Sequence, residues 1–145
     1  MRAAYRVLAS LVAVGVVLQA MFIALGGFTA IKDIDGGAVF DKNSDLNAGQ
    51  TLHGTVGMMV IPIIALLLLI VSFFAKVDGG IKWALYVVGL VVLQIALAFL
   101  SFSAPVVGLL HGLNAFGLLG IATMASRRAS RAPSPAATTE PTTVV

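Results

Sequence analysis

The chain has 145 residues, enough for one domain, and its composition is 59% hydrophobic and only 10% charged. Because soluble domains are about a quarter charged, this composition predicts an integral membrane protein whose main partner is the lipid bilayer. The absence of cysteine excludes disulfides, Cys-ligated zinc and a thiol nucleophile, and the net charge of +3 does not indicate nucleic-acid binding, because most Lys and Arg residues flank apolar runs.

The first apolar run, residues 7–28, predicts a membrane-spanning helix. Its roughly 22 residues, at about 1.5 Å each, match a bilayer core about 30 Å thick. Arg2 and Arg6 before it also fit a signal peptide, but the large Phe28 makes the string Gly27-Phe28-Thr29-Ala30 a poor cleavage site. We therefore expect a retained helix.

An acidic outer loop, residues 29–50, is predicted to join the first helix to the second. The string Asn43-Ser44-Asp45 is typical of a helix start, with a side-chain oxygen available to cap and Asp45 near the positive end of the helix dipole. The second helix is therefore predicted to begin near Ser44, and its apolar span to cover residues 51–75. Pro62 is expected to bend this helix because it lacks a backbone donor.

Two further apolar runs, residues 82–102 and 105–126, predict the third and fourth spans. Pro105 fits the first turn of the fourth helix, where a missing N–H costs nothing. The predicted fold class is an all-α membrane protein, a four-helix transmembrane bundle over residues 1–126. Residues 127–145, rich in Ala, Pro, Ser and Thr, are predicted to form a disordered cytoplasmic tail.

The basic residues predict the orientation of the bundle in a bacterial cytoplasmic membrane. Lys32 and Lys42 fall on one side, in the acidic loop. The other seven of the nine Lys and Arg residues fall on the opposite side, namely Arg2, Arg6, Lys76, Lys82, Arg127, Arg128 and Arg131. Because positive charge is retained in the cytoplasm, both termini are expected inside and the acidic loop outside.

Two short strings occur twice, in the same order. Val-Val-Leu-Gln ends at Gln19 and again at Gln94, and Leu-His-Gly contains His53 and His111, the only two histidines of the chain. The repeat predicts two helical hairpins of like orientation, related by an approximate two-fold axis along the membrane normal.

The repeated polar residues are expected at one depth in the outer leaflet. His111 lies six residues after Pro105, about 9 Å along a helix. The two glutamines lie about 12–14 Å from the outer ends of their spans, and His53 reaches a similar depth if its helix begins near Ser44. Lipid does not solvate such groups, so they are expected to face the interior of the bundle.

Two hypotheses explain this polar layer. In one, Gly57 and Gly108 allow close helix packing while the glutamines, the histidines and Asn114, on the helix face of His111, hydrogen-bond between helices. In the other, the glycines make room for a flat macrocycle, and His53 and His111 are the axial ligands of a b-type haem. Gln19 and Gln94 then orient the imidazoles as partners of the unliganded nitrogens. Two ligands are too few for structural zinc.

At these residues the chain resembles one four-helix half of the heme A synthase family, over roughly residues 7–126. The resemblance implies a four-helix bundle in which histidines of the second and fourth helices ligate haem, here His53 and His111. The first outer loop has no Glu, His or Cys, so the haem-oxidising residues of that family have no counterpart, and the synthase reaction is not implied. The pattern is also similar to small four-span bacterial membrane proteins of unknown function.

The function predicted from the sequence is a b-type haem protein that transfers electrons or carries haem and is not itself an enzyme, because no carboxylate or nucleophile cluster accompanies the histidines. Its expected electron partner is a quinone or a larger respiratory membrane complex. One alternative is an accessory or assembly subunit without a cofactor, and another is a carrier of an apolar molecule such as a quinone or lipid. A homo-oligomer is compatible with each hypothesis.

Overall fold

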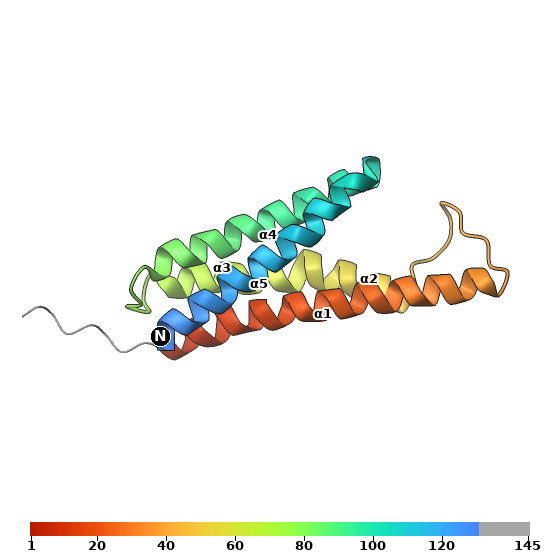
Figure 1. Cartoon of the computed structure of the whole chain (residues 1–145). Helices are drawn as coiled ribbons and strands as arrows, with labels where there is room; N and C mark the ends of the chain where they lie inside the picture. Colours follow the sequence, from red (N-terminus) through yellow and green to blue (C-terminus); the bar gives the residue numbers. More distant parts are fainter. Residues whose placement is uncertain (131–145) are drawn as a thin grey trace, which may run out of the picture.

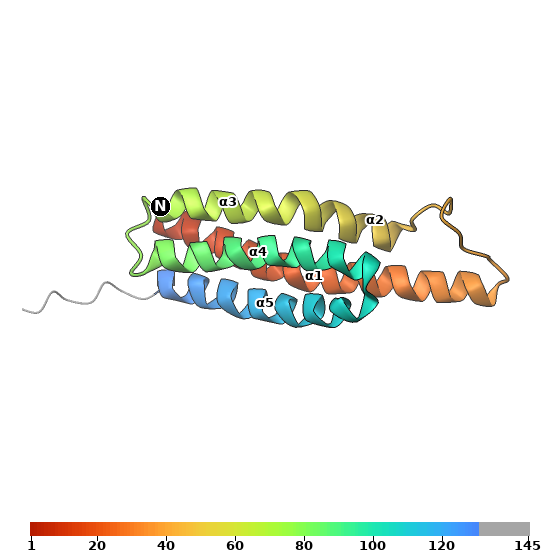
Figure 2. The ribbon, with the colours of Figure 1, turned by 90° about the horizontal axis from the view of Figure 1, so that it is seen from above.

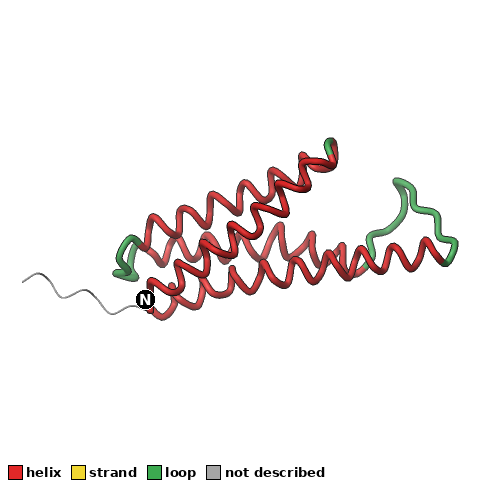
Figure 3. Tube along the Cα trace, in the orientation of Figure 1, coloured by secondary structure: helices red, strands yellow, loops and turns green. Residues whose placement is uncertain are grey.

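The computed structural model describes residues 1–130, and apart from short connections these residues are helical (Figures 1 and 3). In chain order the elements are α1 (Arg2–Asp35), α2 (Ala48–Thr55), the π-helix η1 (Val56–Val60), α3 (Ile61–Ser72), α4 (Gly80–Ser103), the 3-10 helix η2 (Pro105–Val107) and α5 (Gly108–Ser130). The elements α2, η1 and α3 follow one another without a break, as do η2 and α5. The predicted all-α class is confirmed.

Four helical stretches are long and apolar enough to cross a membrane, namely Arg2–Asp35, Ala48–Ser72, Gly80–Ser103 and Pro105–Ser130. They form two antiparallel hairpins that pack into one bundle, with α1 against α5 and α3 against α4 (Figures 1 and 2). The N-terminus, the turn between α3 and α4, and the end of α5 lie at one end, which we call the terminus end. The connection between α1 and α2 lies at the other, the loop end (Figure 1).

Several boundaries differ from those predicted. The first span, predicted over residues 7–28, is part of a helix of 34 residues that reaches Asp35, so the outer loop is 36–47 and not 29–50. The second span covers residues 48–72 and not 51–75, the third 80–103 and not 82–102, and the fourth continues past 126 to Ser130. Residues 127–130, assigned to the tail, are therefore helical, and the rest of the predicted disordered tail lies outside the described residues.

The predicted start of the second helix near Ser44 is wrong. The Asp41 carboxylate accepts hydrogen bonds from the backbone N–H of Asn43, at 2.8 Å, and from the Ser44 hydroxyl, at 3.3 Å, which closes a local turn. These bonds, with that of Asn43 foremost, also hold the pKa of Asp41 below its ordinary value. The helix instead begins after Asn47, whose side chain and that of Gln50 form a reciprocal capping box.

The bend expected at Pro62 takes the form of a local widening of the helix. Pro62 stands in the first turn of α3, directly after the π-helical residues Val56–Val60. Because proline has no N–H to donate to the carbonyl four residues earlier, the α-helical ladder is interrupted there. A π-helical turn shifts the pairing by one residue and lets the chain continue as one rod.

The buried core occupies the half of the bundle nearer the terminus end. Its side chains are small or medium-sized on α1 and α5, including Ala9, Val12, Ala122 and Ala125, which lets these two helices approach closely. Tyr5 closes this end, with its hydroxyl donating to the Gly80 carbonyl at 2.9 Å. Toward the loop end the α4–α5 hairpin diverges from α1 and α2 (Figure 1), so the two hairpins are joined at one end and apart at the other.

A glycine contact fixes how α1 crosses α2. A Cβ atom on Gly49 would lie 2.2 Å from the Gly26 nitrogen and 2.6 Å from the Phe22 carbonyl oxygen, so the two backbones touch. The capping side chain of Asn47 adds a hydrogen bond to the Gly26 carbonyl, at 2.9 Å. This crossing sets the register of the whole second helix against the first.

We expect Gly49→Ala to lower the stability of the protein by about 1–3 kcal/mol, the usual cost of overpacking, because the new methyl group meets backbone and not a flexible side chain. The control is Gly27→Ala, where an added Cβ has no neighbour within 4 Å and improved helix propensity is expected to leave stability equal or slightly higher. Thermal unfolding in mild detergent measures both. Equal melting temperatures for the two variants would contradict a backbone contact at Gly49.

Candidate functional site

A cavity of about 550 Å³ lies between the two hairpins where the buried core ends. Its wall includes the last core side chains of each helix, Val16, Ile61, Val91 and Leu118. The rest of the wall comes from the diverging half of the bundle, and the lining is predominantly apolar. All six residues predicted to form the site line this one cavity, namely Gln19, His53, Gly57, Gln94, Gly108 and His111.

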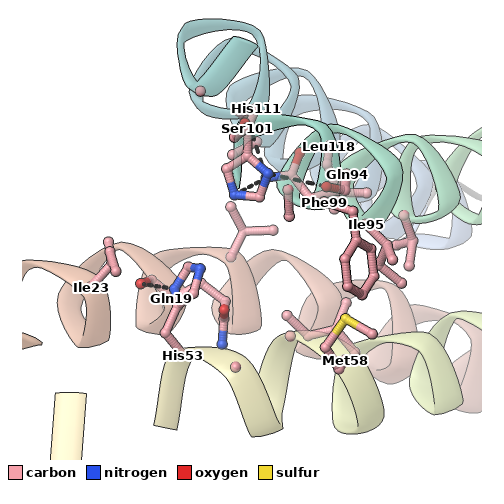
Figure 4. A pocket seen from close by; sticks show the side chains of 18 of the residues that line it. Gln19, Ile23, His53, Met58, Gln94, Ile95, Phe99, Ser101, His111 and Leu118 are labelled. Carbon is pink, nitrogen blue, oxygen red and sulfur yellow. Dashed lines mark hydrogen bonds between the residues drawn. The ribbon is translucent and has the colours of Figure 1, made fainter. Parts of the chain in front are cut away.

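The two histidines approach each other across the cavity from different hairpins, His53 from α2 and His111 from α5 (Figure 4). Their ring centroids are 6.3 Å apart and the ring planes are inclined by 56°. Both side chains are partly buried. Although the two residues are 58 positions apart in the chain, the structure brings their rings together, as the repeat predicted.

Both histidines lie at similar distances from their helix starts although the predicted start of the second helix was wrong. His53 lies six residues after the N-cap Asn47, and His111 lies seven residues after the N-cap Ala104. Starting the second helix at Asn47 instead of Ser44 thus places His53 closer to the helix start than expected. It also makes the distances of the two histidines from their helix starts more nearly equal.

Each histidine is oriented by a glutamine main chain. The Nδ1 atom of His53 lies 3.0 Å from the carbonyl oxygen of Gln19, and that of His111 lies 3.0 Å from the carbonyl oxygen of Gln94 (Figure 4). A carbonyl oxygen only accepts, so Nδ1 carries the proton in both rings. The Nε2 atom of each imidazole then has a lone pair, which is the form of histidine that binds metals.

The side-chain amide of Gln94 uses both its nitrogen and its oxygen in hydrogen bonds. Its Nε2 donates to the Nε2 of His111 and to the His111 main-chain oxygen, both at 3.0 Å. Its Oε1 accepts from the Nδ2 of Asn114 at 2.6 Å, and the same Nδ2 also donates to the Leu90 carbonyl. Gln94 therefore contacts both nitrogens of His111, Nδ1 through its main chain and Nε2 through its side chain.

The first hairpin lacks this arrangement because Val56 stands where the second hairpin has Asn114, three residues after the histidine. The Nε2 of Gln19 is buried without a hydrogen-bond partner among the described residues. The repeat thus conserves the contact between histidine and glutamine main chain, but only the second hairpin has a closed network of side chains.

The two predicted glycines have different roles. A Cβ on Gly57 would lie 2.9 Å from Oε1 of Gln19, so Gly57 makes room for that side chain more than for a ligand. A Cβ on Gly108 would have only the Ser101 hydroxyl near it, at 3.8 Å, so helix packing does not require a glycine there. Asn114, predicted from the sequence as a further polar group on the helix face of His111, hydrogen-bonds to the Gln94 side chain and the Leu90 carbonyl.

The cavity lining offers two histidines as metal ligands, His53 and His111, and no cysteine or carboxylate. Among the described residues, no cluster of three or more His, Cys, Asp or Glu side chains could hold a metal ion. The chain was also compared with protein-family models, with curated proteins and with solved structures, and no match was found in any of the three. The two neighbouring imidazoles are the feature of the site from which we infer a function.

We expect Asn114→Leu to destabilise the protein by about 1–3 kcal/mol, because it leaves the Oε1 of Gln94 without its donor and removes the second bond of Asn114, to the Leu90 carbonyl. Leu113→Ala is the control, since the neighbouring Leu113 is 67% exposed on the outside of the bundle. Thermal unfolding in detergent compares the two variants. An Asn114 variant as stable as the control would show that this network contributes little to stability.

Proposed function

We propose that the chain is a multi-pass membrane protein that binds one b-type haem between its hairpins, with His53 and His111 as axial ligands. The observation that carries the proposal is the distance of 6.3 Å between the imidazole centroids. Metal–imidazole bonds of about 2.0–2.1 Å place the centres of two rings on opposite sides of one metal ion about 6 Å apart. The centroid spacing is thus that of two ligands of one metal ion, and the His111 Nε2 has to leave the Gln94 amide to bind it.

The surroundings of the pair support the same proposal. The cavity of about 550 Å³ lies within the range of ligand pockets, about 300–1,000 Å³. Gly108 and Ala115, on the helix face of His111, have no long side chains to fill it. The carbonyls of Gln19 and Gln94 hold the two Nδ1 protons, which is how ligating histidines are commonly oriented.

The proposed role is electron transfer or haem carriage in a bacterial cytoplasmic membrane, with both termini in the cytoplasm. A bound haem would supply one-electron chemistry. No acidic side chain lines the cavity in the described part of the chain, and the proposed ligation occupies both of its histidines. A quinone or a larger respiratory complex is the proposed electron partner. The resemblance to one half of heme A synthase supports ligation by the same two residues and not the synthase reaction.

The visible spectrum of protein purified in mild detergent from haem-replete cells tests the proposal. We expect a Soret band and the spectrum of a low-spin haem, lost in the double variant His53→Ala/His111→Ala and retained in the control Leu110→Ala, whose side chain is half-exposed on the bundle surface. A wild-type protein without a Soret band, even after haem is added to it, would overturn the proposal.

One observation favours a second candidate, an accessory or assembly subunit without a cofactor. The network of Gln94, His111 and Asn114 is complete in itself, as expected of polar groups that only hold two helices together. This alternative predicts that replacing both histidines by Asn leaves folding and the recovery of partner proteins unchanged. A carrier of quinone or lipid in the same cavity would instead be revealed by mass spectrometry of co-purified molecules.

A further inference from the structure

The two imidazoles differ at the atom that would bind iron. The Nε2 of His53 has no hydrogen-bond partner in the part of the chain that the structure describes, and it borders the cavity. The Nε2 of His111 accepts a hydrogen bond from the side-chain amide of Gln94, at 3.0 Å. A lone pair binds either a proton donor or a metal, so iron and the Gln94 amide compete for His111 only.

The difference follows from a single departure from the repeat. Asn114 holds the Oε1 of Gln94 at 2.6 Å and thereby directs the amide nitrogen toward His111. In the first hairpin Val56 occupies the corresponding position and offers no hydrogen bond. The Gln19 amide nitrogen is buried and makes no hydrogen bond to any described residue, the imidazole of His53 included.

We infer that the site takes up haem in a fixed order, with His53 binding first and His111 second, after the Gln94 amide has released the His111 Nε2. The inference rests on the proposed function and adds the regulation of the site to it. Gln94 is a positioning residue that keeps the second ligand occupied until the first is in place.

Release of His111 requires the Gln94 amide nitrogen to move away from the His111 Nε2. The Gln94 side chain makes three hydrogen bonds, and two of them do not involve the imidazole: the one to the His111 main-chain oxygen, at 3.0 Å, and the one from Asn114. The main-chain carbonyl of Gln94 continues to hold the Nδ1 of His111, so the ring keeps its direction. The bond that is lost lowers the haem affinity of the site, which suits a protein that passes its haem on.

The experiment is a rapid-mixing titration of haem into protein purified without haem, followed by absorbance. In the wild type we expect a high-spin spectrum first and a low-spin spectrum second. His111→Ala is expected to bind haem but to stop at the high-spin spectrum. His53→Ala is expected to bind roughly fivefold more weakly than His111→Ala, the equivalent of one ordinary hydrogen bond, because its remaining imidazole is occupied by Gln94.

Gln94→Leu removes the competing donor and is expected to accelerate the second phase and to raise the haem affinity roughly fivefold, the equivalent of one ordinary hydrogen bond. Leu93→Ala is the matched control, because Leu93 precedes Gln94 in the chain, is exposed and does not line the cavity; it is expected to leave both phases unchanged. If Gln94→Leu does not fold, Asn114→Val, which copies the first hairpin, serves the same purpose and should also accelerate the second phase.

The outcomes separate the two proposals. Haem binding in which His53→Ala and His111→Ala are weakened equally, or in which neither Gln94→Leu nor Asn114→Val accelerates the second phase, overturns the fixed order and leaves the haem proposal standing. A wild-type protein that binds no haem overturns both. Two phases that merge in the Gln94 variant and persist in the Leu93 variant establish the order.

Discussion

Each histidine donates its Nδ1 proton to the main-chain carbonyl of a glutamine on the preceding helix of its own hairpin, at 3.0 Å in both cases. A main-chain acceptor cannot rotate away, so each ring is fixed in direction and in tautomer. The Nε2 atom of His53 is left without a hydrogen-bond partner in the described part of the chain, and that of His111 meets the Gln94 amide. The cavity and the proposed ligand both depend on this pair of contacts, because an imidazole free to turn would not hold the spacing of 6.3 Å.

The bundle supports these contacts because its helices pack closely in one half and its hairpins diverge in the other. Small side chains such as Ala9 and Ala122 close the terminus end, while the hairpins diverge toward the loop end and leave the cavity (Figures 1 and 4). Within the first hairpin, the contact of Gly26 with Gly49 sets the register that brings His53 to the Gln19 carbonyl. Backbone packing thus positions the polar groups, as expected where lipid offers no hydrophobic drive between helices.

The sequence predicted the four helices, and the repeat predicted that the two histidines and two glutamines would surround one space, because apolar length and buried polarity are strong signals in a membrane protein. It did not predict the helix start at Asn47, since Ser44 is an equally good cap and only the turn around Asp41 decides between them. Nor did it predict the crossing of Gly26 and Gly49 or the partners of Asn114. These depend on which faces of two helices meet, and periodicity does not specify such pairings.

The central claim is that one iron ion is ligated by both imidazoles. Electron–nuclear double resonance on the ferric protein, prepared with ¹⁵N-labelled histidine, tests it most directly because the method counts the nitrogens bound to the iron. Our account predicts couplings from two histidine Nε2 nitrogens, one of which disappears in His111→Ala. Coupling to a single histidine nitrogen in the wild type, or to none, would contradict the claim.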